Sequence, residues 1–75
     1  MIRGLILVKT SSEASPGIVK EAKKTKGVTD AYSTFGRFDV VIFIEAENFP
    51  ALKEISKKIH GTPGIRSTET LTEGD

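Results

Sequence analysis

Residues 28–45, VTDAYSTFGRFDVVIFIE, contain two runs typical of β-strands on either side of a glycine. We expect strands over residues 28–35 and 38–45, because both runs are rich in β-branched and aromatic side chains. Gly36-Arg37 then forms a two-residue turn, with glycine at the first central position as a type II′ turn requires. The segment predicts an antiparallel hairpin whose second strand is the most apolar in the chain.

The segments that flank this hairpin have the features of helices. Before it, Ser15 is suited to cap a helix that has Pro16 in its first turn and stops at Gly27. After it, Asn48 is suited to cap a second helix that ends at Gly61. Apolar residues recur at helical spacing in both segments, namely Ile18, Val19 and Ala22 in the first and Leu52, Ile55 and Ile59 in the second.

Residues 2–9 and 65–71 are expected to form a further strand at each end of the chain. The order β-α-β-β-α-β is the ferredoxin-like plan of the α+β class, here in one domain of residues 1–75. In this plan the four-stranded sheet is antiparallel, the first and third strands are central, and both helices cover one face. Because the two central strands are apolar on both faces, we expect the other face to be buried against a second copy, as a dimeric α/β barrel.

The composition excludes several kinds of stabilisation and of function. The chain of 75 residues has no cysteine and one histidine, which excludes disulfides and thiolate or multi-imidazole metal sites. A domain of this size is marginally stable, so oligomerisation is the expected aid. Eleven basic and ten acidic residues give a net charge of +1, without the basic stripe typical of nucleic-acid binders. We expect a cytoplasmic protein with no cofactor, no metal, no membrane span and no direct DNA binding.

The turn between the hairpin strands is the candidate binding site. The pattern Thr34-x-Gly36-x-Phe38-Asp39 offers backbone N–H groups and one carboxylate, and Arg37 adds a guanidinium. Such a group could hold an amino acid, with backbone amides for its carboxylate and Asp39 for its ammonium. The alternative interpretation is a solvated turn in which Asp39 only satisfies neighbouring backbone amides.

This segment, together with Gly27-Val28 and the final GIRSTET of residues 64–70, resembles the C-terminal effector domain of the Lrp/AsnC regulators, often called the RAM domain. Family members usually show a T-x-G-x-[YF]-D hairpin and a G-[VI]-x-x-[ST]-x-T final strand, and the resemblance covers essentially the whole chain. It implies dimers joined sheet to sheet, rings of dimers up to octamers or decamers, and amino acids bound between dimers. It also implies assembly with full-length regulators.

The resemblance implies a ligand site where hairpin and final-strand residues of neighbouring dimers converge. The residues it designates are Thr34, Gly36, Arg37, Phe38, Asp39, Thr68 and Thr70. Asp39 is expected to bind the ammonium, the amides of Gly36 and Arg37 the carboxylate, and the threonines the side chain. Family transcription factors carry an N-terminal helix-turn-helix, whereas the first strand here begins at Ile2. We therefore expect the stand-alone effector domain, which modulates amino-acid-responsive transcription through assembly.

Three other functions remain open. A dimeric ferredoxin-like enzyme needs a buried acid or base, but the central strands offer only aliphatic residues and Phe43 between their ends, so we expect no enzyme. An ACT-like regulatory domain usually binds its ligand in a glycine-rich loop after the first strand, where this chain has Thr10-Ser11-Ser12-Glu13. The last alternative is an oligomerisation module without a ligand. His60 is interpreted as solvated or as stabilising the end of a helix, and the aromatic residues as packing or interface residues.

Overall fold

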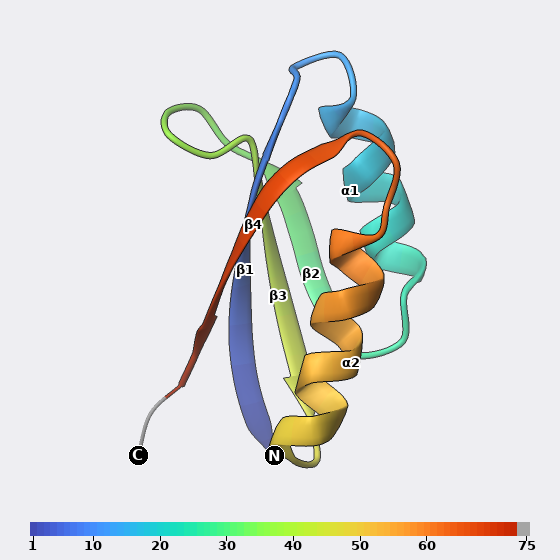
Figure 1. Cartoon of the computed structure of the whole chain (residues 1–75), viewed down its shortest axis with the longest axis vertical. Helices are drawn as coiled ribbons and strands as arrows, with labels where there is room; N and C mark the ends of the chain where they lie inside the picture. Colours follow the sequence, from blue (N-terminus) through green and yellow to red (C-terminus); the bar gives the residue numbers. More distant parts are fainter. Residues whose placement is uncertain (74–75) are drawn as a thin grey trace.

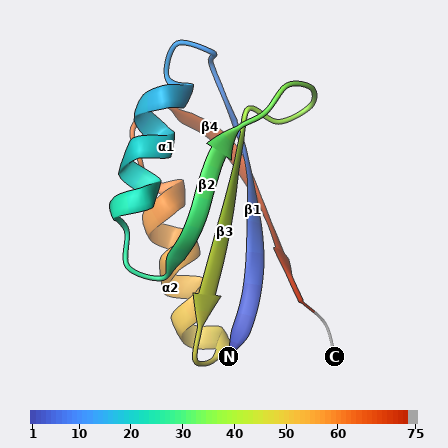
Figure 2. The ribbon, with the colours of Figure 1, turned by 180° about the vertical axis from the view of Figure 1, so that it is seen from behind.

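The computed structural model describes residues 1–73. Its elements are β1 (Ile2–Thr10), α1 (Ser15–Lys24), β2 (Val28–Ser33), β3 (Val40–Ala46), α2 (Phe49–His60) and β4 (Ile65–Thr72). The sheet has the order β2-β3-β1-β4 and all its pairs are antiparallel. The two helices lie side by side on one face of the sheet, and the other face is open (Figures 1 and 2). The expected ferredoxin-like fold, with the first and third strands central, is confirmed.

The core lies between the helices and the sheet. Alternate residues of the central strands point toward the helices, and Ile6, Val8, Val40, Ile42 and Ile44 are at most 1% exposed. The helices contribute the apolar positions expected from their spacing, with Ile18, Ala22, Leu52 and Ile59 buried and Val19 and Ile55 packed against them. Burial of this apolar surface is the main force that holds the two layers together.

The start of α1 differs from the expected Ser15 cap. Ala14 holds the N-cap position and makes no side-chain cap bond, while Ser15 lies inside the helix. The cause is a turn before the helix, in which Ser11 accepts hydrogen bonds from the amides of Ala14 and Ser15. The hydroxyl of Ser15 is therefore free to turn inward, where it is 2.8 Å from Ser33 Oγ. Asn48, by contrast, caps α2 as expected and accepts a hydrogen bond from the amide of Ala51.

The expected two-residue turn at Gly36-Arg37 is wrong. The strands end at Ser33 and resume at Val40, so residues 34–39 form a longer loop. Thr34 closes this loop by donating from its amide to Asp39 O at 2.9 Å and from Oγ1 to Phe38 O at 2.8 Å. Asp39 is meanwhile held by β1, because its amide donates to Val8 O at 2.8 Å. Asp39 is thus bonded on one side to Thr34 and on the other side to β1.

The open face of the sheet carries an apolar surface. Leu5, Leu7, Val41 and Phe43 are half-buried there, and Leu71 of β4 is 48% exposed. Polar groups lie at the margin, where Arg3 and Glu73 form an ion pair at 3.1 Å. Neither helix of the described residues has the length and apolar character needed to cross a lipid bilayer.

Candidate functional site

The β2–β3 loop, residues 34–39, carries five of the residues designated from the sequence. Gly36 has a φ of 126°, a backbone conformation that residues with a Cβ atom rarely adopt. A Cβ at this position would meet nothing within 4 Å, so the glycine serves the turn and not close packing. Among the described residues, the amides of Gly36 and Arg37 donate to no other group. The tip of the loop therefore presents unpaired backbone donors.

A hollow of about 200 Å³ lies at the base of this loop, beside the first turn of α1. It brings together three designated residues, Thr34, Gly36 and Asp39, with hydroxyl-bearing neighbours from other segments. Its lining consists of Ser12, Ser15, Pro16, Ser33, Thr34, Phe35, Gly36 and Asp39. Hydroxyls, a carboxylate and free amides are suited to the polar ends of a small zwitterion.

Asp39 has a structural task in addition. Its Oδ2 accepts a hydrogen bond from the backbone amide of Thr10 at 2.9 Å. Thr10 is 5% exposed, and its hydroxyl donates to Gly64 O. Asp39 thus ties the end of β1 to the base of the loop. A carboxylate has about four acceptor sites, so this bond leaves capacity for a ligand ammonium.

Thr68 and Thr70, the other designated residues, lie on the edge strand β4. Both hydroxyls point to α2: Thr68 Oγ1 is 3.0 Å from His60 Nδ1, and Thr70 Oγ1 donates to Ser56 Oγ at 3.4 Å. The tip of the β2–β3 loop extends away from the helices (Figures 1 and 2), and neither threonine lines the hollow at the base of the loop. The two groups of designated residues therefore do not meet within one chain, and a ligand that contacts both needs two chains.

Sequence reasoning passed over two residues that the structure brings forward. Phe35 was interpreted only as a packing or interface residue, yet at the loop tip its side chain is fully exposed. His60 was interpreted as solvated or as stabilising the end of a helix; it is exposed in the last turn of α2 and in addition contacts Thr68. The position of Phe35 beside a turn glycine was a signal that could have been used. The contact of His60 depends on how α2 packs against β4, which the sequence pattern does not contain.

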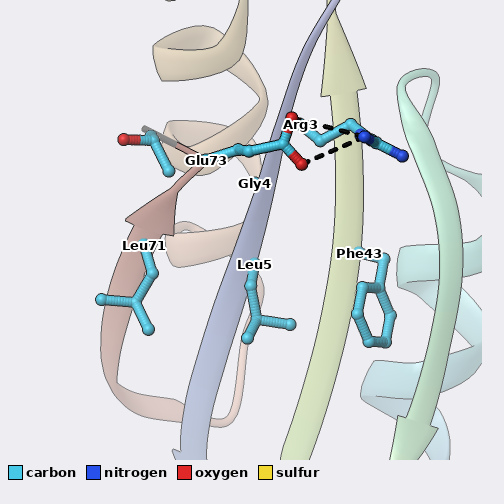
Figure 3. A pocket seen from close by; sticks show the side chains of 7 residues that line it. Arg3, Gly4, Leu5, Phe43, Leu71 and Glu73 are labelled. Atoms are coloured by element: carbon cyan, nitrogen blue, oxygen red, sulfur yellow. Dashed lines mark hydrogen bonds and ion pairs between the residues drawn. The ribbon is translucent and has the colours of Figure 1, made fainter. Parts of the chain in front are cut away.

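A second hollow, of about 440 Å³, lies on the open face of the sheet (Figure 3). Leu5, Phe43 and Leu71 line it from three neighbouring strands, and the Arg3–Glu73 pair closes one end. It is shallow and largely apolar. These features suit a protein surface better than a small polar ligand.

The fold is that of a small α+β domain, and comparisons with known proteins specify its family. The Lrp/AsnC ligand binding domain family matches residues 4–72, so the chain belongs to this family. The HTH-type transcriptional regulator LysM of Sulfurisphaera tokodaii is 29% identical over 70 residues. That match covers 92% of this chain and 50% of the regulator, so the chain spans about half the length of this relative.

Solved structures agree with the family assignment. AsnC of E. coli superimposes with a TM-score of 0.86 and 27% identity, over 96% of this chain and 50% of AsnC. A protein from Thermus thermophilus gives a TM-score of 0.92 at 21% identity, over 100% of this chain and 95% of its own. The siroheme decarboxylase NirDL gives 0.86 at 12% identity, over 99% of this chain and 26% of the enzyme. The last two likenesses show the fold alone.

Proposed function

We propose that this domain binds an amino acid between copies of itself and couples that binding to the assembly of a transcription regulator in the cytoplasm. The observation that carries the proposal is that the hollow at the base of the β2–β3 loop is lined by three designated residues but by neither Thr68 nor Thr70, whose hydroxyls contact α2 instead. Each group offers polar atoms to a ligand, and only a second chain can bring them together. Ligand binding in this geometry stabilises contacts between chains.

The open face of the sheet supports dimers as the unit of that assembly. Leu5, Phe43 and Leu71 form an apolar surface across β3, β1 and β4 (Figure 3). Stable soluble monomers rarely leave an apolar face of this kind in water. A contact made through this face does not use the edge hydrogen bonds of β2 and β4. A ring of such dimers can then form the ligand sites between neighbours.

A regulatory function is favoured over an enzymatic one. The curated relative is a transcriptional regulator, and AsnC is a member of the same family. The fold alone does not decide, because NirDL shares it. Within the loop the single carboxylate of Asp39 has no second ionisable group bonded to it, and its contact is a backbone amide. Acid–base chemistry needs positioned proton donors and acceptors, which this arrangement does not supply.

Isothermal calorimetry against the twenty amino acids, combined with sedimentation velocity, tests the proposal. We expect at least one amino acid to bind at millimolar concentration or below and to change the sedimentation coefficient. Binding without a change in assembly would contradict the coupling. If no amino acid binds and the chain still forms dimers, the oligomerisation module without a ligand becomes the better interpretation.

A further inference from the structure

The lysines of the chain are unevenly distributed over the fold. Seven of the eight lie on the two helices or directly after α1, namely Lys20, Lys23, Lys24, Lys26, Lys53, Lys57 and Lys58. Residues 15–26 and 49–60 contain only two carboxylates, Glu21 and Glu54, so this helix layer carries a net charge of +5. The remaining residues have four basic and eight acidic side chains and carry a net charge of −4. The overall net charge of +1 therefore conceals a separation of charge between the helix layer and the rest of the chain.

The lysines of the helix layer face solvent, and all seven are exposed. Lys20, Lys24 and Lys57 are each two positions from a buried residue of their helix, about 200° around the helix axis from the side that packs on the sheet. The helices cover the face of the sheet opposite to its apolar open face (Figures 1 and 2). A dimer contact made through the open face therefore does not use the lysines of the helix layer.

Lysines of both helices meet between the helices. A hollow of about 580 Å³ between α1 and the end of α2 has Lys20 and Lys58 in its lining, together with Glu21. Among residues 1–73, Glu21 forms an ion pair with Lys24 at 4.0 Å, and the other six lysines of the helix layer form none. Neighbouring like charges without a partner destabilise a helix surface. A polyanion that lies across both helices relieves this repulsion.

The helix layer lacks the side chains that protein and lipid partners need. The cores of protein interfaces are enriched in aromatic side chains, Met and Arg and are depleted of Lys. Of the large apolar side chains that are exposed among residues 1–73, Phe49 is the one on a helix, and it lies at the start of α2. A helix that binds a membrane surface needs an exposed apolar face, whereas the apolar residues of both helices pack on the sheet. These features favour a partner that is recognised by charge alone.

Duplex DNA is a partner of this kind. Its phosphate backbone carries one negative charge per about 1.7 Å and is bound by lysines without regard to sequence. The planar groups of Arg, Asn and Gln read base edges through paired hydrogen bonds, and neither α1 nor α2 contains these residues. Proteins that bind single strands stack the bases on exposed aromatic side chains, and the helix layer has only Phe49 at its margin. The composition therefore fits the backbone of a duplex.

We propose that the lysine-rich helix layer binds the phosphate backbone of duplex DNA without sequence specificity. The sequence predicted no direct DNA binding, because the net charge is small and no basic stripe is visible along the chain. The basic surface arises in the fold, since residues 20–26 and 53–58 are distant in sequence and lie on the same face of the sheet (Figure 1). The inference does not depend on amino-acid binding, because none of the seven lysines lines the hollow at the base of the β2–β3 loop.

Fluorescence anisotropy with labelled duplex DNA at salt concentrations between about 50 and 200 mM tests the inference. Each phosphate that a lysine neutralises contributes about −0.9 to the slope of log K against log salt, so contacts from about three to five lysines lower the affinity about 40- to 500-fold over this range. We expect duplexes of unrelated sequence to bind equally. No binding by about 100 μM protein at the lowest salt concentration would overturn the inference. Tighter binding of a single strand, of duplex RNA or of an acidic peptide such as polyglutamate would overturn it as well.

Two variants of equal charge locate the contact. Lys57→Gln removes one lysine from the helix layer and is expected to reduce the salt slope by about 1. Lys9→Gln is the matched control: this exposed lysine of β1 lies between two buried residues that face the helices, so its side chain points away from them. It should leave the slope unchanged, and an equal reduction in both variants would overturn the inference. Calorimetry with amino acids should give the same result for Lys57→Gln and the wild type, so this inference and the proposed function can fail separately.

Discussion

The carboxylate of Asp39 and the backbone amide of Thr10 are joined by a hydrogen bond of 2.9 Å between residues 29 positions apart. The same aspartate donates from its own amide to Val8 O. These bonds attach the β2–β3 loop to the end of β1 and fix where the loop leaves the sheet. The residue expected to bind a ligand ammonium therefore also determines the geometry of the loop that presents the other ligand groups.

The two tasks of Asp39 can be separated by comparing Asp39→Ala with Asp39→Asn. The alanine variant leaves the buried Thr10 amide without a partner, which costs about 1–3 kcal/mol of unfolding free energy. The asparagine variant keeps an acceptor oxygen, so we expect a loss of less than about 1 kcal/mol. Urea denaturation of both variants measures this difference.

Ligand binding by the Asp39→Asn variant then isolates the role of the charge. If the carboxylate binds the ammonium of an amino acid, the affinity falls about ten- to a hundredfold, since a hydrogen bond to a charged group contributes about 1.5–3 kcal/mol. Calorimetry on the folded variant measures the change. An affinity equal to that of the wild type would leave Asp39 with the structural task alone.

Adjacent residues on opposite faces of β1 provide a test of the dimer. Leu5 lies on the open face between Phe43 and Leu71, and Ile6 is fully buried beneath the helices. We expect Leu5→Asp to remain folded but to become monomeric, because an unpaired charge in the dimer contact costs about 3–5 kcal/mol. Ile6→Asp puts the same charge into the core and unfolds the chain.

Circular dichroism and sedimentation velocity distinguish these outcomes. A Leu5→Asp variant that remains dimeric at micromolar concentration would show that the open face is not the dimer contact. A wild type that is monomeric and stable under the same conditions would contradict the dimer itself.

We expect replacement by alanine to change the unfolding free energy in opposite directions at two glycines. Gly27 has a φ of 95°, and a Cβ there would collide with Cδ1 of Ile55. Gly27→Ala should lower the unfolding free energy by about 2–4 kcal/mol, from backbone strain and overpacking together. Gly17 lies in α1 with nothing within 4 Å of an added Cβ, so Gly17→Ala should raise stability by about 0.5–1 kcal/mol.

Thermal denaturation of the two glycine variants and the wild type measures whether each substitution lowers or raises the stability. A neutral Gly27→Ala would mean that Ile55 and the backbone adapt more readily than the packing indicates.

The sequence predicted the strand order and the core because periodicity determines which side chains face the helices. The alternation of Val40, Ile42 and Ile44 and the spacing of Leu52 and Ile59 depend only on local geometry, and the structure has them buried. Asn48 was identified as a cap for the same reason, since its bond to Ala51 spans three residues.

The loop was predicted less well because contacts distant in sequence shape it. Gly36 is compatible both with the expected two-residue turn and with the longer loop that the structure has. The bonds from Asp39 to Val8 and Thr10 decide between them, and they join segments that no local pattern relates. The contact of His60 with Thr68 depends similarly on how α2 packs against β4. Whether the designated loop residues and Thr68 share a ligand depends on a second chain.

Phe35 provides a test of contacts between dimers. Its side chain is fully exposed at the tip of the β2–β3 loop, so it contributes nothing to the packing of its own chain. Burial of a phenylalanine against a neighbour contributes about 1.5–3 kcal/mol, and every loop of a ring repeats the contact. We expect Phe35→Ser to unfold at the same urea concentration as the wild type, yet to stop assembly at the dimer in light scattering.

Phe49→Ser is the matched control, because this phenylalanine is also exposed, at 58%, but lies at the start of α2 away from the loop. It should leave both the dimer and the larger assembly intact. Amino acids that bind between dimers should shift assembly of the Phe49→Ser variant as they do in the wild type, and should fail to do so in Phe35→Ser. An unchanged ring in Phe35→Ser would mean that the loop tip does not join the dimers. In that case the free amides of Gly36 and Arg37 would have to act within one dimer.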